Sequence, residues 1–183
     1  TDNTEWQNLT TGAWCYYNND PTKPRLYNWY AVAGIHDTDP NTPNKEFAPE
    51  GWHVPSDAEW TTLEEYLIAN GYNYDGTTTG NKIAKSMAST TGWNDYTPGT
   101  SAGYPSNDQS LNNSSGFNAI PEGGRESFQG GFIYMGDLAS AYFWSSTERT
   151  MRQLEDLNIN LIRNFYISTQ ANQWGSSVRF VKD

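Results

Sequence analysis

The 183-residue chain has one cysteine, Cys15, and two histidines, His36 and His53. A single cysteine excludes an intrachain disulfide and a cysteine-rich metal cluster, and two histidines are too few for a three-histidine iron site. Basic residues are also scarce, since 11 Lys and Arg against 21 Asp and Glu give a net charge of -10. Such a surface repels phosphate groups, so we expect neither nucleic acid nor anionic membrane as a partner.

Long apolar runs are missing as well. No stretch approaches the roughly 20 apolar residues of a membrane-spanning helix, so we expect no transmembrane segment in this chain. Thr1 does not begin a signal peptide. The initiator Met is also absent, which indicates a trimmed chain, so we do not take the absence of a leader as a sign of a cytoplasmic protein.

Aromatic residues compensate for a low hydrophobic content of 36%. Eight Trp, twelve Tyr and seven Phe make up 15% of the chain, and each ring buries about 150–250 Å². We therefore expect a core built from rings, with further rings left at the surface.

The strongest helix signal begins at Ser56, which can form a reciprocal capping box with Glu59. Trp60, Leu63, Tyr66 and Leu67 follow at i, i+3 and i+4 spacing, which predicts a helix over residues 56–69 with this stripe in the core. We expect a second, shorter helix over residues 81–88. Residues 150–157 are the one later segment in which a longer helix is an alternative.

Strands and loops account for the rest of the chain. Residues 6–33 indicate strand, turn and strand, and short strands are expected at residues 132–135, 142–145, 161–167 and 177–181. Turn residues dominate residues 89–131, and a loop region of that length is often functional. The order of elements predicts an α+β fold, with short helices, a small twisted antiparallel sheet and long loops, in a single domain over residues 1–183.

Six segments of this chain, in this order, resemble the Fibrobacter succinogenes major paralogous domain. They lie at residues 13–20, 26–32, 51–60, 115–121, 143–148 and 177–183 and read AWCYYNND, LYNWYAV, GWHVPSDAEW, SGFNAIP, FWSSTE and SVRFVKD. The resemblance implies a C-type-lectin-like fold and a secreted or surface-tethered bacterial protein, often a lipoprotein, in organisms that handle polysaccharides. Where the family commonly has a cysteine, this chain has Phe180.

The family is similar to the formylglycine-generating enzyme group, whose oxidative chemistry depends on a pair of cysteines. Because Cys15 stands alone, we expect that activity to be absent. We also expect His53 to be a packed, hydrogen-bonded histidine and Cys15 a small core residue. Carboxylates for a glycosidase pair are present, but no spacing singles out two of them.

Trp93 and Trp174 stand in polar loop sequence where no apolar periodicity requires a ring. An exposed ring beside amides and acids is typical of a sugar-binding site, because the ring stacks on the apolar face of the sugar. The alternative is a ring that covers the core beneath its loop. Arg125 likewise either ties its loop together or presents its charge to a ligand.

Trp93, Asn94 and Asp95 also match the Trp-Asn-Asp motif of calcium-binding C-type lectins, but no Glu-Pro-Asn or Gln-Pro-Asp partner stands upstream. We therefore expect no cofactor, with calcium as the alternative and no metal ligands assigned.

Together these observations predict a non-catalytic recognition domain, secreted or anchored at the outer surface, that binds a neutral polysaccharide or glycan through its aromatic-rich loops. The alternative is a protein–protein adhesin, or a component of a surface structure, that binds a surface or host protein with the same loops. The expected ligand-binding residues are Trp93, Asn94, Asp95, Tyr96, Arg125, Asn172 and Trp174.

Overall fold

The computed structural model describes residues 2–96, 100–132, 139–166 and 169–183. Its helices are α1 (Asn3–Gln7), α2 (Trp29–Val32), α3 (Asp57–Ala69) and α4 (Ala84–Met87), with short 3₁₀ turns at Tyr17–Asn19, Gln109–Leu111 and Thr169–Gln173. Its strands are β1 (Trp14–Tyr16), β2 (Arg25–Tyr27), β3 (Trp52–His53), β4 (Ser140–Trp144), β5 (Thr150–Glu155), β6 (Ile162–Phe165) and β7 (Val181–Lys182).

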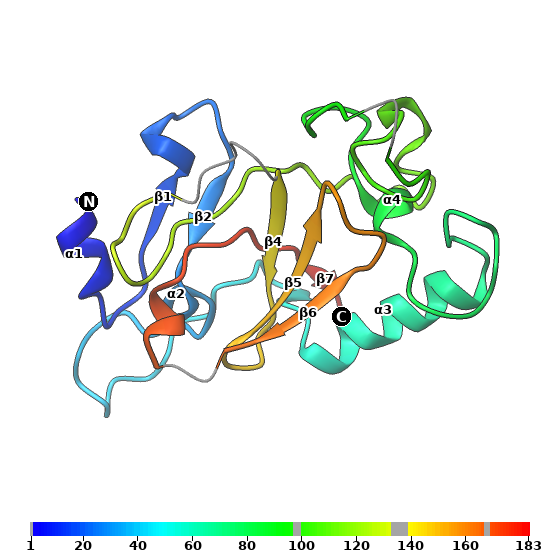
Figure 1. The fold of residues 1–183 in the computed structure, drawn as a ribbon. Helices are drawn as coiled ribbons and strands as arrows, with labels where there is room; N and C mark the ends of the chain where they lie inside the picture. Colours follow the sequence, from blue (N-terminus) through cyan, green and yellow to red (C-terminus); the bar gives the residue numbers. More distant parts are fainter. Residues whose placement is uncertain (1, 97–99, 133–138, 167–168) are drawn as a thin grey trace.

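The strands form three small antiparallel sheets, β1-β2, β3-β7 and β4-β5-β6. In Figure 1 the three-stranded sheet lies at the centre, the β1-β2 hairpin lies on the left, and α3 runs along the lower right. Short helices with small antiparallel sheets confirm the α+β prediction. None of the helices in the described ranges is long and apolar enough to cross a membrane.

Helix α3 begins where the sequence predicts. The Ser56 hydroxyl accepts a hydrogen bond from Glu59 N (3.2 Å), and Glu59 Oε2 accepts one from Ser56 N (2.8 Å). Trp60 and Leu67 are buried and Leu63 packs against the core, but Tyr66 is 59% exposed. The expectation that Tyr66 belongs to the core stripe is wrong. Tyr66 is exposed because it lies about 100° around the helix from the buried Leu67.

Three parts of the chain adopt helix or strand where the sequence indicated the other. Residues 29–32, predicted as the end of a strand, form α2, because the Asn28 side chain accepts a hydrogen bond from Ala31 N (3.0 Å) and starts a helical turn. Residues 150–157, where a helix was the alternative, contain β5, whose first five residues are all buried. Trp6, expected in an extended segment, lies in α1. Of the strand expected at residues 132–135, only Phe132 lies in the described ranges.

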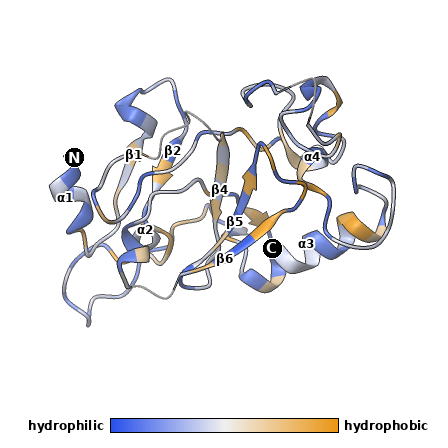
Figure 2. Ribbon diagram, viewed as in Figure 1, coloured by the Kyte–Doolittle hydropathy of each residue, from blue (hydrophilic) through white to orange (hydrophobic). Residues whose placement is uncertain are grey.

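The core has two clusters of buried side chains. The larger one joins α3 and α4 to β4 and β5 and includes Trp60, Trp93 and Phe143. The smaller one contains Trp6, Cys15 and Leu26. Figure 2 shows orange, hydrophobic positions on the central strands and on part of α3, while most loops are blue or pale. Rings therefore supply much of the core volume, as the composition predicts.

A buried lysine holds the loop that follows α4. Lys85 is 6% exposed. Its ammonium group donates to the carbonyl oxygens of Tyr104 (3.4 Å), Asn107 and Asp108 (3.1 Å) and to Asn112 Oδ1 (3.0 Å). The positive charge thus lies among four oxygen atoms from residues 104–112, and it fixes that segment against α4.

Candidate functional site

Trp93 lies in the core. Its side chain is 5% exposed and belongs to the larger cluster. The Gln109 side chain holds this loop down, because it accepts a hydrogen bond from Trp93 N (3.1 Å) and donates one to Trp93 O (2.9 Å). The expectation of an exposed ligand-binding ring at Trp93 is therefore wrong. Polar neighbours in the sequence gave no sign that the loop folds back onto the core.

The next residues also serve the fold. Asn94 Nδ2 donates to Asp156 Oδ2 (2.8 Å), and this buried carboxylate also accepts from Ala139 N (3.0 Å). Tyr96 is half-buried, with its hydroxyl 3.3 Å from Asn94 Nδ2, while Asp95 is exposed. In the part of the chain that the structure describes, no group of three or more His, Cys, Asp or Glu side chains is placed to hold a metal ion.

Arg125 is 1% exposed. Its guanidinium donates to Gly130 O (2.6 Å) and Asp2 O (3.0 Å) and lies 4.4 Å from the centre of the Trp6 ring. The second interpretation of this arginine, a charge presented to a ligand, does not fit such burial. Arg125 instead ties its own loop to the N-terminal segment.

Asn172 and Trp174 lie near Arg125, because Arg125 and Gly175 exchange two main-chain hydrogen bonds (2.9 and 2.7 Å). Asn172 is buried, and its amide donates to Glu148 Oε1 (3.1 Å). Trp174 is half-buried and stacks on Tyr166, with ring centres 5.8 Å apart. The contacts therefore join Arg125 to the Trp174 segment, whereas Trp93 and Asn94 have other partners.

An apolar groove that is open to solvent lies between α3 and the C-terminal segment. This groove has a volume of about 540 Å³. Its apolar walls are formed by Pro55, Trp60, Leu63, Tyr66, Phe117, Phe180 and Val181. Tyr66, Phe180 and Val181 are 59%, 38% and 40% exposed, so the groove presents rings and an aliphatic side chain to solvent. We call it the α3 groove.

The sequence contained one unused signal for this groove. Phe180 and Val181 are adjacent apolar residues that stand between the charged residues Arg179 and Lys182. An exposed apolar patch among charged residues indicates a binding surface, and both side chains line the groove.

A second hollow of about 410 Å³ shares Arg179 and Phe180 with the α3 groove. Arg25 and Glu122 also line it, and Glu122 forms an ion pair with Lys23 (3.5 Å). Arg179 donates to Phe117 O (3.3 Å) and Asn118 O (3.1 Å), and its guanidinium lies 5.1 Å from the centre of the Phe117 ring. These contacts fix Arg179 between the two hollows.

A histidine joins two carboxylates at the edge of the α3 groove. His53 Nδ1 lies 2.6 Å from Asp183 Oδ1, and His53 Nε2 lies 2.7 Å from Glu59 Oε1. The hydrogen bond to Asp183, followed by that to Glu59, raises the pKa of His53. The main-chain hydrogen bond from Ser56 is the largest of the causes that lower the pKa of Glu59. His53 is thus hydrogen-bonded as predicted, and it links β3, the start of α3 and the end of the chain.

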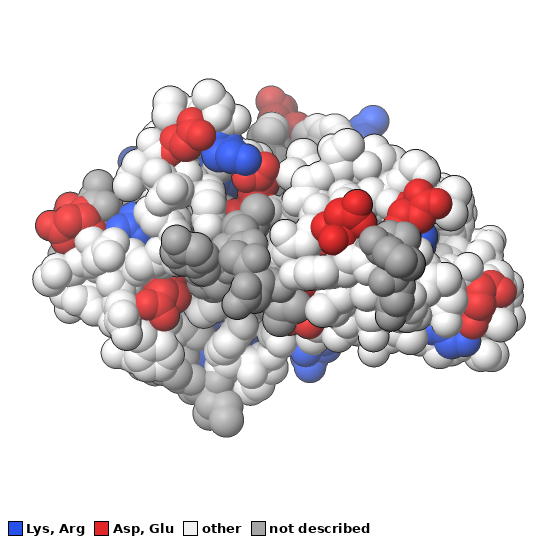
Figure 3. Space-filling model, turned by 45° about the horizontal axis from the view of Figure 1, so that its top comes forward, with Lys and Arg blue, Asp and Glu red and all other residues white. Residues whose placement is uncertain are grey.

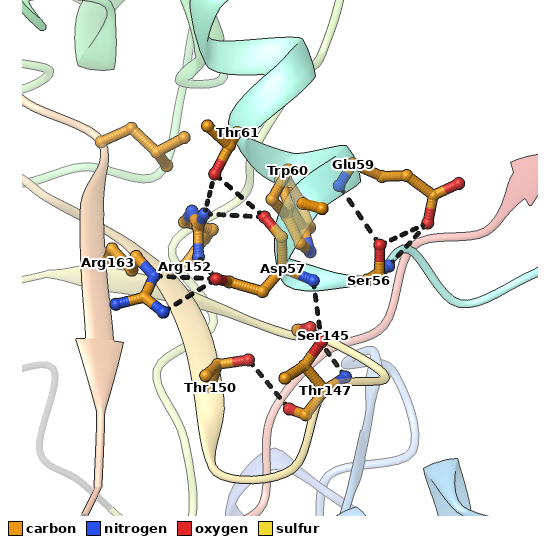
Figure 4. A network of polar contacts seen from close by, with 12 residues as sticks. Ser56, Asp57, Glu59, Trp60, Thr61, Ser145, Thr147, Thr150, Arg152 and Arg163 are labelled. Carbon is orange, nitrogen blue, oxygen red and sulfur yellow. Dashed lines mark hydrogen bonds and ion pairs between the residues drawn. The ribbon is translucent and has the colours of Figure 1, made fainter.

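Figure 4 shows how the first turn of α3 is anchored to the central sheet. The Asp57 carboxylate lies between Arg152 on β5 (2.6 Å) and Arg163 on β6 (2.8 Å). Asp57 N donates to Thr147 Oγ1 (3.1 Å), so the turn before β5 also holds this helix end. The pKa of Asp57 is lowered, chiefly by the hydrogen bonds from Arg163. Helix α3, which forms one wall of the groove, is therefore held in place by these contacts of Asp57.

On the face drawn in Figure 3, the charged side chains do not gather into a single patch. Figure 3 shows one face on which red carboxylates are scattered among uncharged residues, with fewer blue side chains between them. This distribution agrees with the net charge of -10.

The model of the Fibrobacter succinogenes major domain family matches residues 1–182. The chain belongs to this family. It matches no curated protein and no solved structure.

Five of the six segments that carry the likeness to the Fibrobacter succinogenes major domain meet around the two hollows, and residues 13–20 line neither of them. Residues 51–60 supply Pro55 and Trp60, residues 115–121 supply Phe117, and residues 177–183 supply Phe180 and Val181. Residues 26–32 and 143–148 contribute Tyr27 and Phe143 to the second hollow. Segments far apart in the sequence thus build one continuous surface feature.

Proposed function

We propose that this domain is a non-catalytic recognition module that binds a protein partner by taking apolar side chains into the α3 groove. The observation that carries the proposal is an open, ring-lined groove beside exposed Tyr66 and Phe180. Apolar concavities with few polar groups are the usual sites of recognition, and exposed apolar patches mark interaction surfaces.

The polar groups of the groove support binding rather than catalysis. Glu59 is occupied by Ser56 and His53, and Arg179 by two carbonyl oxygens. Cys15 is buried, and burial raises the pKa of its thiol, which disfavours the reactive thiolate.

The proposal includes a C-type-lectin-like arrangement and a secreted or surface-anchored location. The pairing of β3 with β7 and the bridge from Tyr27 to Ser176 support such an arrangement, because they return the end of the chain to its first half. Proteolysis of intact cells with an external protease tests the location. The domain should be cleaved while a cytoplasmic marker survives.

A neutral carbohydrate is the second candidate ligand. Tyr66 favours it, because this exposed ring shares the groove with Glu59 and Arg179, and sugar sites combine a stacking ring with groups that bind hydroxyls. Of the two tryptophans in the sequence-based hypothesis, Trp174, which keeps part of its surface exposed, is the one that still suits this role.

One protein preparation tests both candidates. It is screened against random peptides displayed on phage and against a glycan array, and the hits are titrated with the Tyr66→Ala and Phe165→Ala variants. Phe165 is a matched control, since it is 60% exposed and lies outside the groove. We expect peptide hits whose affinity falls about tenfold in Tyr66→Ala, as for loss of a hot-spot ring, and is unchanged in Phe165→Ala. Glycan hits without peptide hits would favour the second candidate, and hits insensitive to Tyr66→Ala would exclude the groove.

A further inference from the structure

The strand beside the α3 groove has a free edge. Strand β7 pairs with β3 in the register Trp52↔Lys182 and His53↔Val181, and Asp183 N donates to Gly51 O (3.1 Å). In an antiparallel ladder, hydrogen-bonded and non-hydrogen-bonded pairs alternate. Since Asp183 faces Gly51 in a bonded pair, Val181 is bonded to His53, and the N–H and C=O of Lys182 point away from β3.

These outward groups are unused within the described ranges. The β3-β7 sheet has two strands, and no hydrogen bond there joins the Lys182 main chain to another residue. An edge of this kind is a template for a further strand. The free edge at Lys182 lies close to the α3 groove, because the neighbouring residue Val181 forms part of the groove wall.

We propose that the partner is an extended peptide segment that adds to the free edge of β7, bonds the Lys182 main chain and places its apolar side chains in the α3 groove. This inference rests on the proposed function, and it names the conformation and chemistry of the ligand. Strand addition derives affinity from main-chain hydrogen bonds and specificity from pockets for alternate side chains. Here the free edge of β7 supplies the main-chain hydrogen bonds, and the α3 groove supplies the pockets for side chains.

Charge defines the segment further. Glu59 and Asp183, both well exposed, share one imidazole, so this group is net negative whether or not His53 is protonated. The Lys182 side chain points to the face opposite Val181, because strand side chains alternate. Arg179 is directed at carbonyl oxygens. With a chain charge of -10, these groups favour a basic peptide segment. Its apolar residues should alternate with polar ones, and one Lys or Arg should lie near Glu59 and Asp183.

The test compares two substitutions at one position. Lys182→Pro removes the outward N–H and leaves the bonded pair of Val181 and His53 in place, whereas Lys182→Ala removes only the side chain. The probes are the phage-selected peptides, made synthetically and titrated by calorimetry. We expect about tenfold weaker binding to Lys182→Pro, as for one lost hydrogen bond in a dry site, and binding within about twofold of the parent for Lys182→Ala.

Hydrogen exchange gives a second readout. The Lys182 amide should exchange rapidly in the free protein and become protected with peptide, while the Val181 amide is protected in both states. Peptides that bind Lys182→Pro as tightly as the parent, yet lose affinity in Tyr66→Ala, would overturn strand addition and leave the proposed function standing. Peptides insensitive to both changes would overturn the two together. Self-association of the free protein that Lys182→Pro abolishes would identify a second copy of the chain as the occupant and overturn the heterologous peptide.

Discussion

The Arg152 guanidinium has no exposed surface and donates to Asp57 Oδ1 over 2.6 Å, joining the centre of the sheet to the first turn of α3. Arg163 contacts the same carboxylate from the solvent side, with half of its own side chain exposed. One carboxylate thus forms ion pairs with a buried and an exposed cation.

These two ion pairs differ in their contribution to stability. Asp57→Ala should lower the free energy of unfolding by about 3–5 kcal/mol, because it leaves the Arg152 charge buried without a carboxylate. Arg163→Ala should cost less than about 1 kcal/mol, since water replaces its contact. Urea unfolding at neutral pH measures both values, and equal losses would contradict the asymmetry.

Acid should weaken the same contact. The pKa of Asp57 is lowered in the folded state, first by Arg163 and then by Arg152, so its stabilisation is complete above the pKa of an unfolded Asp, about 4. It is lost as the pH falls through the lower, folded-state pKa. The unfolding free energy of the parent should therefore fall more steeply below pH about 4 than that of Asp57→Asn. Parallel curves would show that this carboxylate does not contribute.

Alkali should weaken the bridge at His53. Its pKa is raised in the folded state, so its contribution is complete below the unfolded value of about 6.5 and is lost as the pH rises through the folded-state pKa. Between pH 6 and 9 the parent should lose stability relative to His53→Gln. His36→Gln, at a position outside β3, is the control for substituting a histidine.

The two kinds of tryptophan can be told apart by substitution. Trp93→Ala should cost about 3–5 kcal/mol, because it opens a cavity in the larger core cluster. Trp52→Ala, at a position that is 45% exposed, should cost no more than about 1 kcal/mol. Thermal unfolding of both variants is the measurement. A Trp93→Ala variant as stable as the parent would show that this ring does not contribute to the core.

Local signals predicted what local interactions decide. The capping box of Ser56 and Glu59 fixes the start of α3 within four residues of chain, and the sequence located it correctly. Trp93 depends instead on Gln109, and the α3 groove depends on Phe117 meeting Phe180 and Trp60. Such tertiary contacts leave no periodic trace, so the loops looked exposed and the groove went unpredicted.

The buried Lys85 should be the most sensitive point of the loop region. Lys85→Met removes the donor shared by four oxygen atoms, and unpaired buried carbonyl groups cost about 1–3 kcal/mol each. We expect amides of residues 104–112 to exchange faster, while those of β5 keep their protection. Unchanged exchange across residues 104–112 would show that the lysine does not hold them.

The Lys85 ammonium also determines which solution conditions residues 104–112 tolerate. A bound calcium ion would also be held by oxygen atoms, but it needs six to eight of them, whereas here four oxygen atoms surround a positive charge that is covalently part of the chain. A tethered cation does not dissociate and does not compete with other ions. The order of residues 104–112 should therefore withstand chelators and dilution alike.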